Sequence, residues 1–142
     1  GVDVIVGFPG ETTDLFNETV NFLKDLDISY LHVFTYSERA NTTAKKMTDV
    51  VPVHERKERS KILHLLSDRK KRNFYEKNKG SVRKVLFEDE NHDGYIHGFT
   101  ENYIKIKTPY QKDLSNSFHN VELKHLDRDG IYKVKTESTI DS

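Results

Sequence analysis

The sequence predicts an α/β part followed by an all-β part, and three observations support this. Two apolar runs within the first 35 residues flank a stretch in which apolar residues recur at helical spacing. A long charged stretch with helical spacing follows over residues 53–78. After Gly80 apolar residues alternate with polar ones, as in strands. We therefore expect a first domain over residues 1–79 and a small five-stranded β-barrel over residues 80–138.

The first part begins with a strand, a turn and a helix. Val2 to Val6 are mostly β-branched and apolar, which is typical of a strand buried on both faces. The glycines of Gly7 to Gly10 break this strand, and Thr12 or Thr13 is placed to cap the helix that follows. Ile28 to Thr35 predicts a second strand, which the intervening helix makes parallel to the first.

The long helix over residues 53–78 is expected to have one apolar stripe and one polar, mostly basic face. The loop before it, residues 36–53, shows no clear period. The apolar stripe comprises Ile62, Leu63, Leu65, Leu66, Arg69, Phe74 and Tyr75. The polar face comprises Arg56, Lys57, Arg59, Lys61, Lys70, Lys71 and Arg72. Gly80 follows as a left-handed cap.

Short alternating runs separated by turn residues predict the barrel. The runs are Ser81–Glu88, Tyr95–Phe99, Asn102–Lys107, Val121–Lys124 and Ile131–Val134. Alternation places Tyr103, Lys105 and Lys107 on one face of their strand. Because this face carries two lysines, we expect it to be the outer one, where aromatic rings stack on bases and lysines meet phosphates.

The composition excludes several classes of protein. The chain has 142 residues, of which 35% are hydrophobic, enough for one ordinary domain or two small ones. It has no apolar run of about 18 residues and no signal peptide at its start, so we expect a cytoplasmic protein with no membrane partner. It has no cysteine, and its seven histidines lack the spacing of a zinc site. We therefore expect no metal site within this chain.

The charges are segregated along the chain. Residues 54–84 hold 12 Lys or Arg and 4 Asp or Glu, a net of +8, whereas residues 1–53 and 85–142 each carry −4. A central basic block predicts an anionic partner such as a nucleic acid. A solvated helix with spare lysines remains the alternative.

Two loops follow the predicted parallel strands. Gly7 to Glu11 (GFPGE) has glycines that let a ligand approach the backbone, but it matches neither a Walker loop nor a dinucleotide fingerprint. Arg39 follows the second strand, and ligands of parallel sheets bind beyond the carboxyl ends of strands. Spacing alone leaves open a ligand site or a plain turn at GFPGE. For Arg39 it leaves open bidentate anion binding or an ion pair with Glu11 or Glu38.

Three stretches in this order resemble the methylthiotransferases that use radical S-adenosylmethionine chemistry. DVIVGFPGET and LHVFTYSERANTTA are similar to the end of the radical domain, where the family carries DIIVGFPGET and YS-x-R-x-G-T-x-A. The part after Gly80, with GFTENYIKI at its centre, resembles the TRAM domain of the same family, a small RNA-binding β-barrel. The resemblance covers residues 2–136 and is strongest to the subfamily that modifies threonylcarbamoyladenosine beside the tRNA anticodon.

The chain also departs from the family. Asn41 and Thr43 replace a usual Gly and a common Pro, and Asp3 replaces the first Gly of the strand motif. The family uses S-adenosylmethionine and two 4Fe-4S clusters held by cysteines, and this chain has none. The resemblance is therefore to the C-terminal third of such an enzyme, which implies no catalytic residue, no cluster ligand and no activity for this chain alone.

The resemblance also implies a set of site residues. The last α/β unit would belong to a partial radical S-adenosylmethionine barrel, with cofactor contacts from Ile5, Gly7, Phe34, Tyr36, Ser37 and Arg39. The helix and the TRAM barrel would bind RNA through Arg56, Lys57, Lys70, Lys71, Arg72, Lys84, Tyr103, Lys105 and Lys107. The implied partner is a tRNA anticodon stem-loop.

Alternatives to this function remain open. The chain is alternatively a free-standing RNA-binding module, an interaction domain that binds no RNA, or part of a methylthiotransferase acting on isopentenyl-adenosine tRNA or on a ribosomal protein. The apolar first strand and the open edges of a two-stranded sheet also predict a homodimer or a domain swap of the first third.

Overall fold

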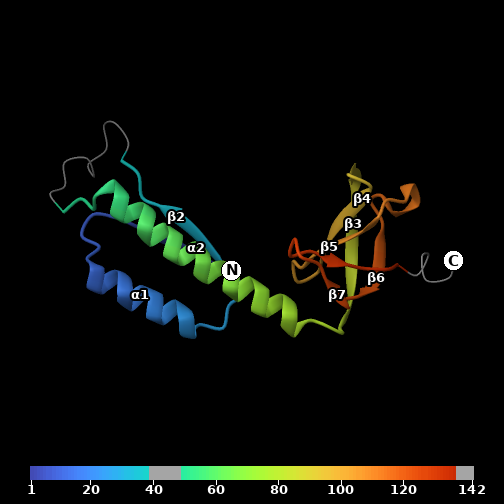
Figure 1. Cartoon of the computed structure of the whole chain (residues 1–142), viewed down its shortest axis with the longest axis horizontal. Helices are drawn as coiled ribbons and strands as arrows, with labels where there is room; N and C mark the ends of the chain where they lie inside the picture. The colour runs from blue at the N-terminus through green and yellow to red at the C-terminus, as the bar shows by residue number, and fades with distance from the viewer. Residues whose placement is uncertain (39–48, 137–142) are drawn as a thin grey trace. The chain divides into compact units, whose positions relative to one another are not determined.

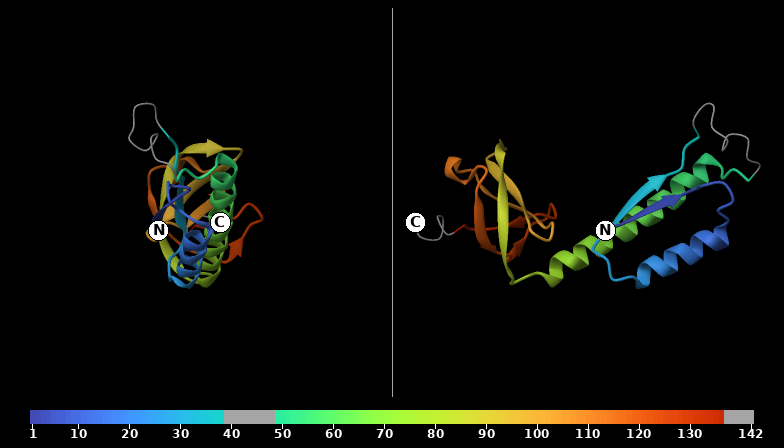
Figure 2. Two further views of the ribbon diagram at one scale, coloured as in Figure 1. Left: turned by 90° about the vertical axis from the view of Figure 1, so that its left-hand side faces the viewer. Right: turned by 180° about the vertical axis from the view of Figure 1, so that it is seen from behind.

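The computed structural model describes residues 1–38 and 49–136, and it divides into two compact units (Figures 1 and 2). The units are Gly1–Asn73 and Phe74–Ser142. The division falls inside the long helix, whereas the sequence places the domain boundary after it. The reason is that the last turn of the helix packs into the core of the second unit through Tyr75.

The first unit contains the expected strand–helix–strand arrangement. Its elements are β1 (Val2–Val6), α1 (Thr13–Asp25), β2 (Leu31–Thr35) and most of α2 (Val53–Lys77). β1 and β2 pair in parallel, with Val4 opposite Val33. The Thr12 hydroxyl oxygen accepts a hydrogen bond from the Leu15 amide at 3.1 Å, which starts α1. The parallel βαβ unit predicted from the sequence is therefore confirmed.

The core of this unit lies between the strands and the two helices. Its buried members are Val6, Phe16, Val20, Leu23, Leu31, Leu63 and Leu66. The prediction that β1 is buried on both faces is wrong for the described residues. Ile5 is 55% exposed and its neighbour on β2, Phe34, is 54% exposed. Both helices contribute to the core on one side of this two-stranded sheet, so alternate side chains point outward.

α2 is as long as expected, but its buried stripe differs from the prediction. Ile62 and Leu65, expected inside, are 43% and 58% exposed. The buried stripe begins with two arginines, Arg56 and Arg59, and then continues to Leu63 and Leu66. These positions still follow helical spacing, but the early ones contact a polar loop rather than an apolar core.

The second unit is a curled, mostly antiparallel sheet that contains one short parallel pair. Its strands are β3 (Val82–His92), β4 (Tyr95–Thr100), β5 (Lys105–Pro109), β6 (Phe118–Glu122), β7 (His125–Leu126) and β8 (Tyr132–Lys133). The order across the sheet is β6-β3-β4-β5-β8-β7, and only β5 and β8 run parallel. A short 3-10 helix, η2 (Lys112–Leu114), precedes β6.

This sheet differs in two respects from the predicted five-stranded barrel. Its described residues form six strands, because β7 follows the expected fourth strand, whose first two residues, Val121 and Glu122, end β6. The expected third strand begins at Lys105 rather than Asn102, because Tyr103 adopts a left-handed conformation (φ 66°) in the preceding turn. The six strands form a half-barrel curled around one apolar core.

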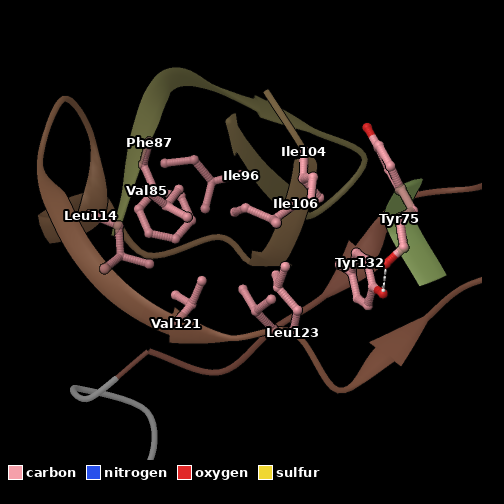
Figure 3. Close-up of a cluster of buried hydrophobic side chains, with 11 residues drawn as sticks. Tyr75, Val85, Phe87, Ile96, Ile104, Ile106, Leu114, Val121, Leu123 and Tyr132 are labelled. Carbon is pink, nitrogen blue, oxygen red and sulfur yellow. Dashed lines mark hydrogen bonds between the residues drawn. The ribbon is translucent and has the colours of Figure 1, made fainter. Parts of the chain in front are cut away.

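The core of the second unit is drawn in Figure 3. Phe87, Ile96 and Ile106 are fully buried there. Tyr75, from the last turn of α2, stacks on Tyr132 with ring centroids 6.0 Å apart. The Tyr132 hydroxyl donates to the Tyr75 carbonyl at 2.5 Å, and the Tyr75 hydroxyl accepts from the Lys105 amide at 2.9 Å. Burial raises the pKa of both tyrosine hydroxyls, so both stay protonated.

The described part of the chain has no membrane-spanning helix. Neither of its helices is sufficiently long and apolar to cross a bilayer.

Candidate functional site

The turn after β1 is held in place by its own glutamate. Gly7 has φ 75°, and its amide donates to the Glu11 carboxylate at 2.7 Å. Glu11 is only 3% exposed. The Tyr36 amide donates to the Val6 carbonyl at 2.9 Å, which brings the start of the loop after β2 beside this turn. The two loops therefore meet at the carboxyl ends of the parallel strands, as predicted.

Arg59 of α2 forms a buried ion pair with Glu11. Its Nη1 atom lies 3.0 Å from the Glu11 carboxylate and 2.6 Å from the Glu11 carbonyl oxygen. Their side chains are 9% and 1% exposed, so each charge offsets the cost of removing the other from water. The side chain of Glu55, one helical turn earlier, lies 3.7 Å from the other end of the guanidinium. The ion pair ties the GFPGE turn to the start of α2.

Arg56 connects the same turn to the segments around it. Its Nε donates to the Val51 carbonyl at 2.7 Å, and its Nη2 pairs with Glu38. A Cβ atom on Gly7 would lie 2.5 Å from the Arg56 Cγ atom. Gly7 is therefore required both by its backbone conformation and by the close approach of this arginine.

The two carboxylates that the sequence offered as partners of Arg39 take part in these contacts. Arg39 itself lies outside the described residues. The two carboxylates considered as its partners, Glu11 and Glu38, pair with Arg59 and Arg56. The sequence contains a pattern that indicates these pairs. Arg56 and Arg59 are three residues apart and share a helical face with Leu63 and Leu66. Sequence reasoning assigned both arginines to the exposed face, and that placement is wrong.

The predicted cofactor residues of the first unit lie in different environments. Ile5 and Phe34 are register partners on the open face of the sheet and form an apolar surface. Tyr36 follows β2, and within residues 1–38 and 49–136 its buried hydroxyl has no hydrogen-bond partner. Gly7 contacts Arg56 instead of facing open space, and Ser37 is exposed. Ile5 and Phe34 thus present apolar side chains on the sheet, and Tyr36 adds a buried hydroxyl just after β2.

The described residues do not form a metal site. No group of three or more His, Cys, Asp or Glu side chains in the described ranges is arranged to hold a metal ion. The full sequence also has no cysteine. Ligands for an iron–sulfur cluster are therefore not among these residues.

The predicted RNA-binding residues of α2 have different environments. Lys57, Lys71 and Arg72 are exposed. Lys70 donates from Nζ to the Leu26 carbonyl at 2.8 Å and binds the end of α1. Arg56 is 5% exposed, and its guanidinium is engaged in the first unit, so its expected place on an RNA-facing surface is corrected.

The predicted RNA-binding residues of the barrel also differ in their exposure to solvent. Lys84 is exposed, Lys105 is half-buried and Tyr103 is 74% exposed in the turn before β5. Lys107 is 7% exposed, because its Nζ lies 2.8 Å from Asp127 and 2.7 Å from Asp129. These hydrogen bonds raise the pKa of Lys107 and lower the pKa of each carboxyl group. The expectation that Lys107 faces outward with Lys105 is therefore corrected.

Comparison with known proteins identifies the relatives of this chain. No protein-family model matches it. The threonylcarbamoyladenosine tRNA methylthiotransferase MtaB of Aquifex aeolicus is 46% identical over 114 residues, covering 80% of this chain and 27% of that protein. The MtaB protein of Bacillus subtilis is 35% identical over 125 residues, covering 85% of this chain and 28% of that protein. The chain belongs to the tRNA methylthiotransferase family.

The chain is also similar to members of this family whose names give a different modified nucleoside. A tRNA-2-methylthio-N(6)-dimethylallyladenosine synthase of Endomicrobium trichonymphae is 35% identical over 122 residues, covering 86% of this chain and 29% of that protein. The chain thus spans less than a third of the length of these methylthiotransferases. The family resemblance inferred from the three sequence stretches is confirmed.

Proposed function

We propose that this chain is part of a tRNA methylthiotransferase that adds a methylthio group to C2 of N6-threonylcarbamoyladenosine beside the anticodon. The 46% identity to the Aquifex aeolicus MtaB protein carries this proposal. The dimethylallyladenosine synthases are the second candidate, because the one from Endomicrobium trichonymphae matches at 35% identity. A cytoplasmic location follows as part of the proposal, because the substrate would be tRNA.

The first unit would form one wall of an S-adenosylmethionine site within a partial barrel. In such an enzyme S-adenosylmethionine, together with a reduced cluster, supplies the radical chemistry. Ile5 and Phe34 would cover apolar surface of the bound group, and the unpartnered hydroxyl of Tyr36 would hydrogen-bond to it. Glu11, Arg56 and Arg59 would hold the adjoining turn in shape. Because this chain supplies no cysteine, we propose that it has no activity alone.

The basic residues would position the tRNA. The exposed side chains of Lys57, Lys71, Arg72 and Lys84 would contact phosphates of an anticodon stem-loop. The local net charge of +8 over residues 54–84 supports an anionic partner for α2 and the start of β3. Such contacts position RNA without reading its sequence.

A chimeric enzyme tests the proposed activity. The segment of the Aquifex aeolicus relative that aligns with this chain is replaced by the chain, and the chimera is expressed in cells without their own methylthiotransferase. We expect mass spectrometry of tRNA nucleosides to find the methylthio group on threonylcarbamoyladenosine. The same group on dimethylallyladenosine would favour the second candidate, and a folded chimera that modifies neither would contradict the proposal. The unaltered relative is the positive control.

The open face of the β1–β2 sheet supports the homodimer or domain swap expected from the sequence. Ile5 and Phe34 are both more than half exposed on this face. When this chain is alone, a second copy would cover them and pair the open sheet edges. We expect light scattering at high protein concentration to give the mass of a dimer. A monomer under these conditions would rule out this association.

A further inference from the structure

One face of the second unit carries a row of exposed apolar side chains across neighbouring strands. Leu86 on β3 lies directly opposite Phe118 on β6 and Phe99 on β4. Phe118 is 60%, Leu86 46% and Phe99 42% exposed. Lys105 on β5 pairs with Phe99 and continues the row. We call Phe118, Leu86, Phe99 and Lys105 the aromatic row.

The aromatic row lies on the face of the sheet opposite the core. Val85 and Phe87, the neighbours of Leu86 along β3, are completely buried. Successive side chains of a strand point to opposite faces, so Leu86 and its register partners point outward. A single exposed apolar residue is ordinary, but three in register on adjacent strands form a continuous apolar patch.

Lysines lie over both rings of the row. The Lys84 Nζ is 4.7 Å from the centroid of the Phe118 ring, and the Lys105 Nζ is 6.0 Å from that of Phe99. Each ring thus has a positive charge within reach of a ligand that stacks on it. The row itself contains no acidic side chain. An apolar surface with positive charge at the rings is complementary to an anionic ligand that has flat apolar faces.

We propose that the aromatic row is a stacking platform for unpaired bases of an RNA loop, with Lys84 and Lys105 contacting the adjoining phosphates. Strands are about 4.8 Å apart, so the two phenylalanines, one strand removed from each other, stand about 10 Å apart. Each ring therefore has room for its own base. Paired bases hide their faces within a duplex, so a duplex would not use the row. This inference rests on the proposed function, which gives RNA as the partner. The new part is that the row binds the unpaired bases of a loop.

The test compares two RNA probes on the full chain and on the Phe99→Ala/Phe118→Ala variant. One probe is a synthetic hairpin with an unpaired loop, and the other is a fully paired duplex with the same number of phosphates. We expect hairpin affinity to fall about tenfold for each ring removed, because each ring would lose the base stacked on it. Duplex affinity should not change, because phosphate contacts from lysines remain.

Two further variants serve as controls. Phe22→Ala removes an aromatic side chain on α1 that is 65% exposed and outside the row, so both affinities should remain unchanged. Lys84→Gln/Lys105→Gln should weaken binding and reduce the salt dependence by about one unit of slope for each lysine. Far-UV circular dichroism checks that each variant keeps its fold.

The outcomes separate this inference from the proposed function. If the unaltered chain binds the hairpin and the double phenylalanine variant binds equally well, the aromatic row is not the platform and the proposed function stands. If the double phenylalanine variant loses hairpin and duplex binding equally, base stacking is not how the row binds RNA. If the unaltered chain binds neither probe, RNA binding by this chain fails, and the inference fails with it.

Discussion

Replacing Arg59 with methionine is expected to lower the free energy of unfolding of the first unit by about 3–5 kcal/mol. The substitution leaves the carboxylate of Glu11, which is 3% exposed, without its charged partner. It also removes the donor to the Glu11 carbonyl. Urea denaturation followed by far-UV circular dichroism measures the loss, because α1 and much of α2 belong to this unit.

Matched variants identify the unpaired carboxylate as the cause. Glu11→Gln in the Arg59→Met background removes the charge, while the amide oxygen still accepts from Gly7, so part of the stability should return. Lys57→Met removes an exposed charge from the same helix and should change the free energy by less than about 0.5 kcal/mol. An unfolding midpoint for Arg59→Met equal to that of Lys57→Met would contradict a structural role for the ion pair.

Replacing Phe87 with alanine is expected to cost the second unit a similar amount, about 3–5 kcal/mol. Phe87 is completely buried on β3, and its ring lies edge-on to His119 with centroids 5.7 Å apart. Its removal leaves a cavity that the surrounding strands close only in part. Urea denaturation followed by near-UV circular dichroism reports the buried tyrosines of this unit, Tyr75 and Tyr132.

The control for this prediction lies on the same strand. Val82→Ala shortens a side chain that is 66% exposed, so the free energy should change by less than about 0.5 kcal/mol. Equal effects of the two substitutions would mean that the core does not depend on Phe87. A smaller cost for Phe87→Ala, with a new ordered packing, would mean that the half-barrel collapses around the missing ring.

The sequence predicts the elements of the first unit well because their signals are local. The β-branched run of β1, the cap at Thr12 and the amphipathic α1 each depend on neighbours in the chain. The parallel pairing follows from the length of the connection. The exposure of Ile5 and Phe34 does not follow, because burial of the second face of a strand depends on what packs against it.

The candidate site shows a similar division. Sequence reasoning selected the GFPGE turn and the end of the second strand, and these do meet. It placed Arg56 and Arg59 on the exposed face, because periodicity assigns a side chain to a face without showing what that face contacts. The charge of the long helix likewise predicted an exposed basic surface, yet Lys70 binds backbone carbonyls at the end of α1.

In the barrel, alternation predicted that Lys105 and Lys107 share a face, but it did not predict their different environments. Asp127 and Asp129 reach Lys107 from a turn far along the chain, and no local pattern records that contact. The sequence also does not predict the aromatic row, because Phe118, Leu86 and Phe99 become neighbours only through strand register.

The sequence by itself therefore determined the order of the elements, the change from helical to strand periodicity and, through three motif stretches, the family. The tertiary structure decided which charges are buried in pairs and which apolar residues form a surface. The physical reason is that secondary structure depends mainly on residues close in the chain, whereas burial and ion pairing depend on segments far apart in it. Glu11 and Arg59, 48 residues apart, form such a pair.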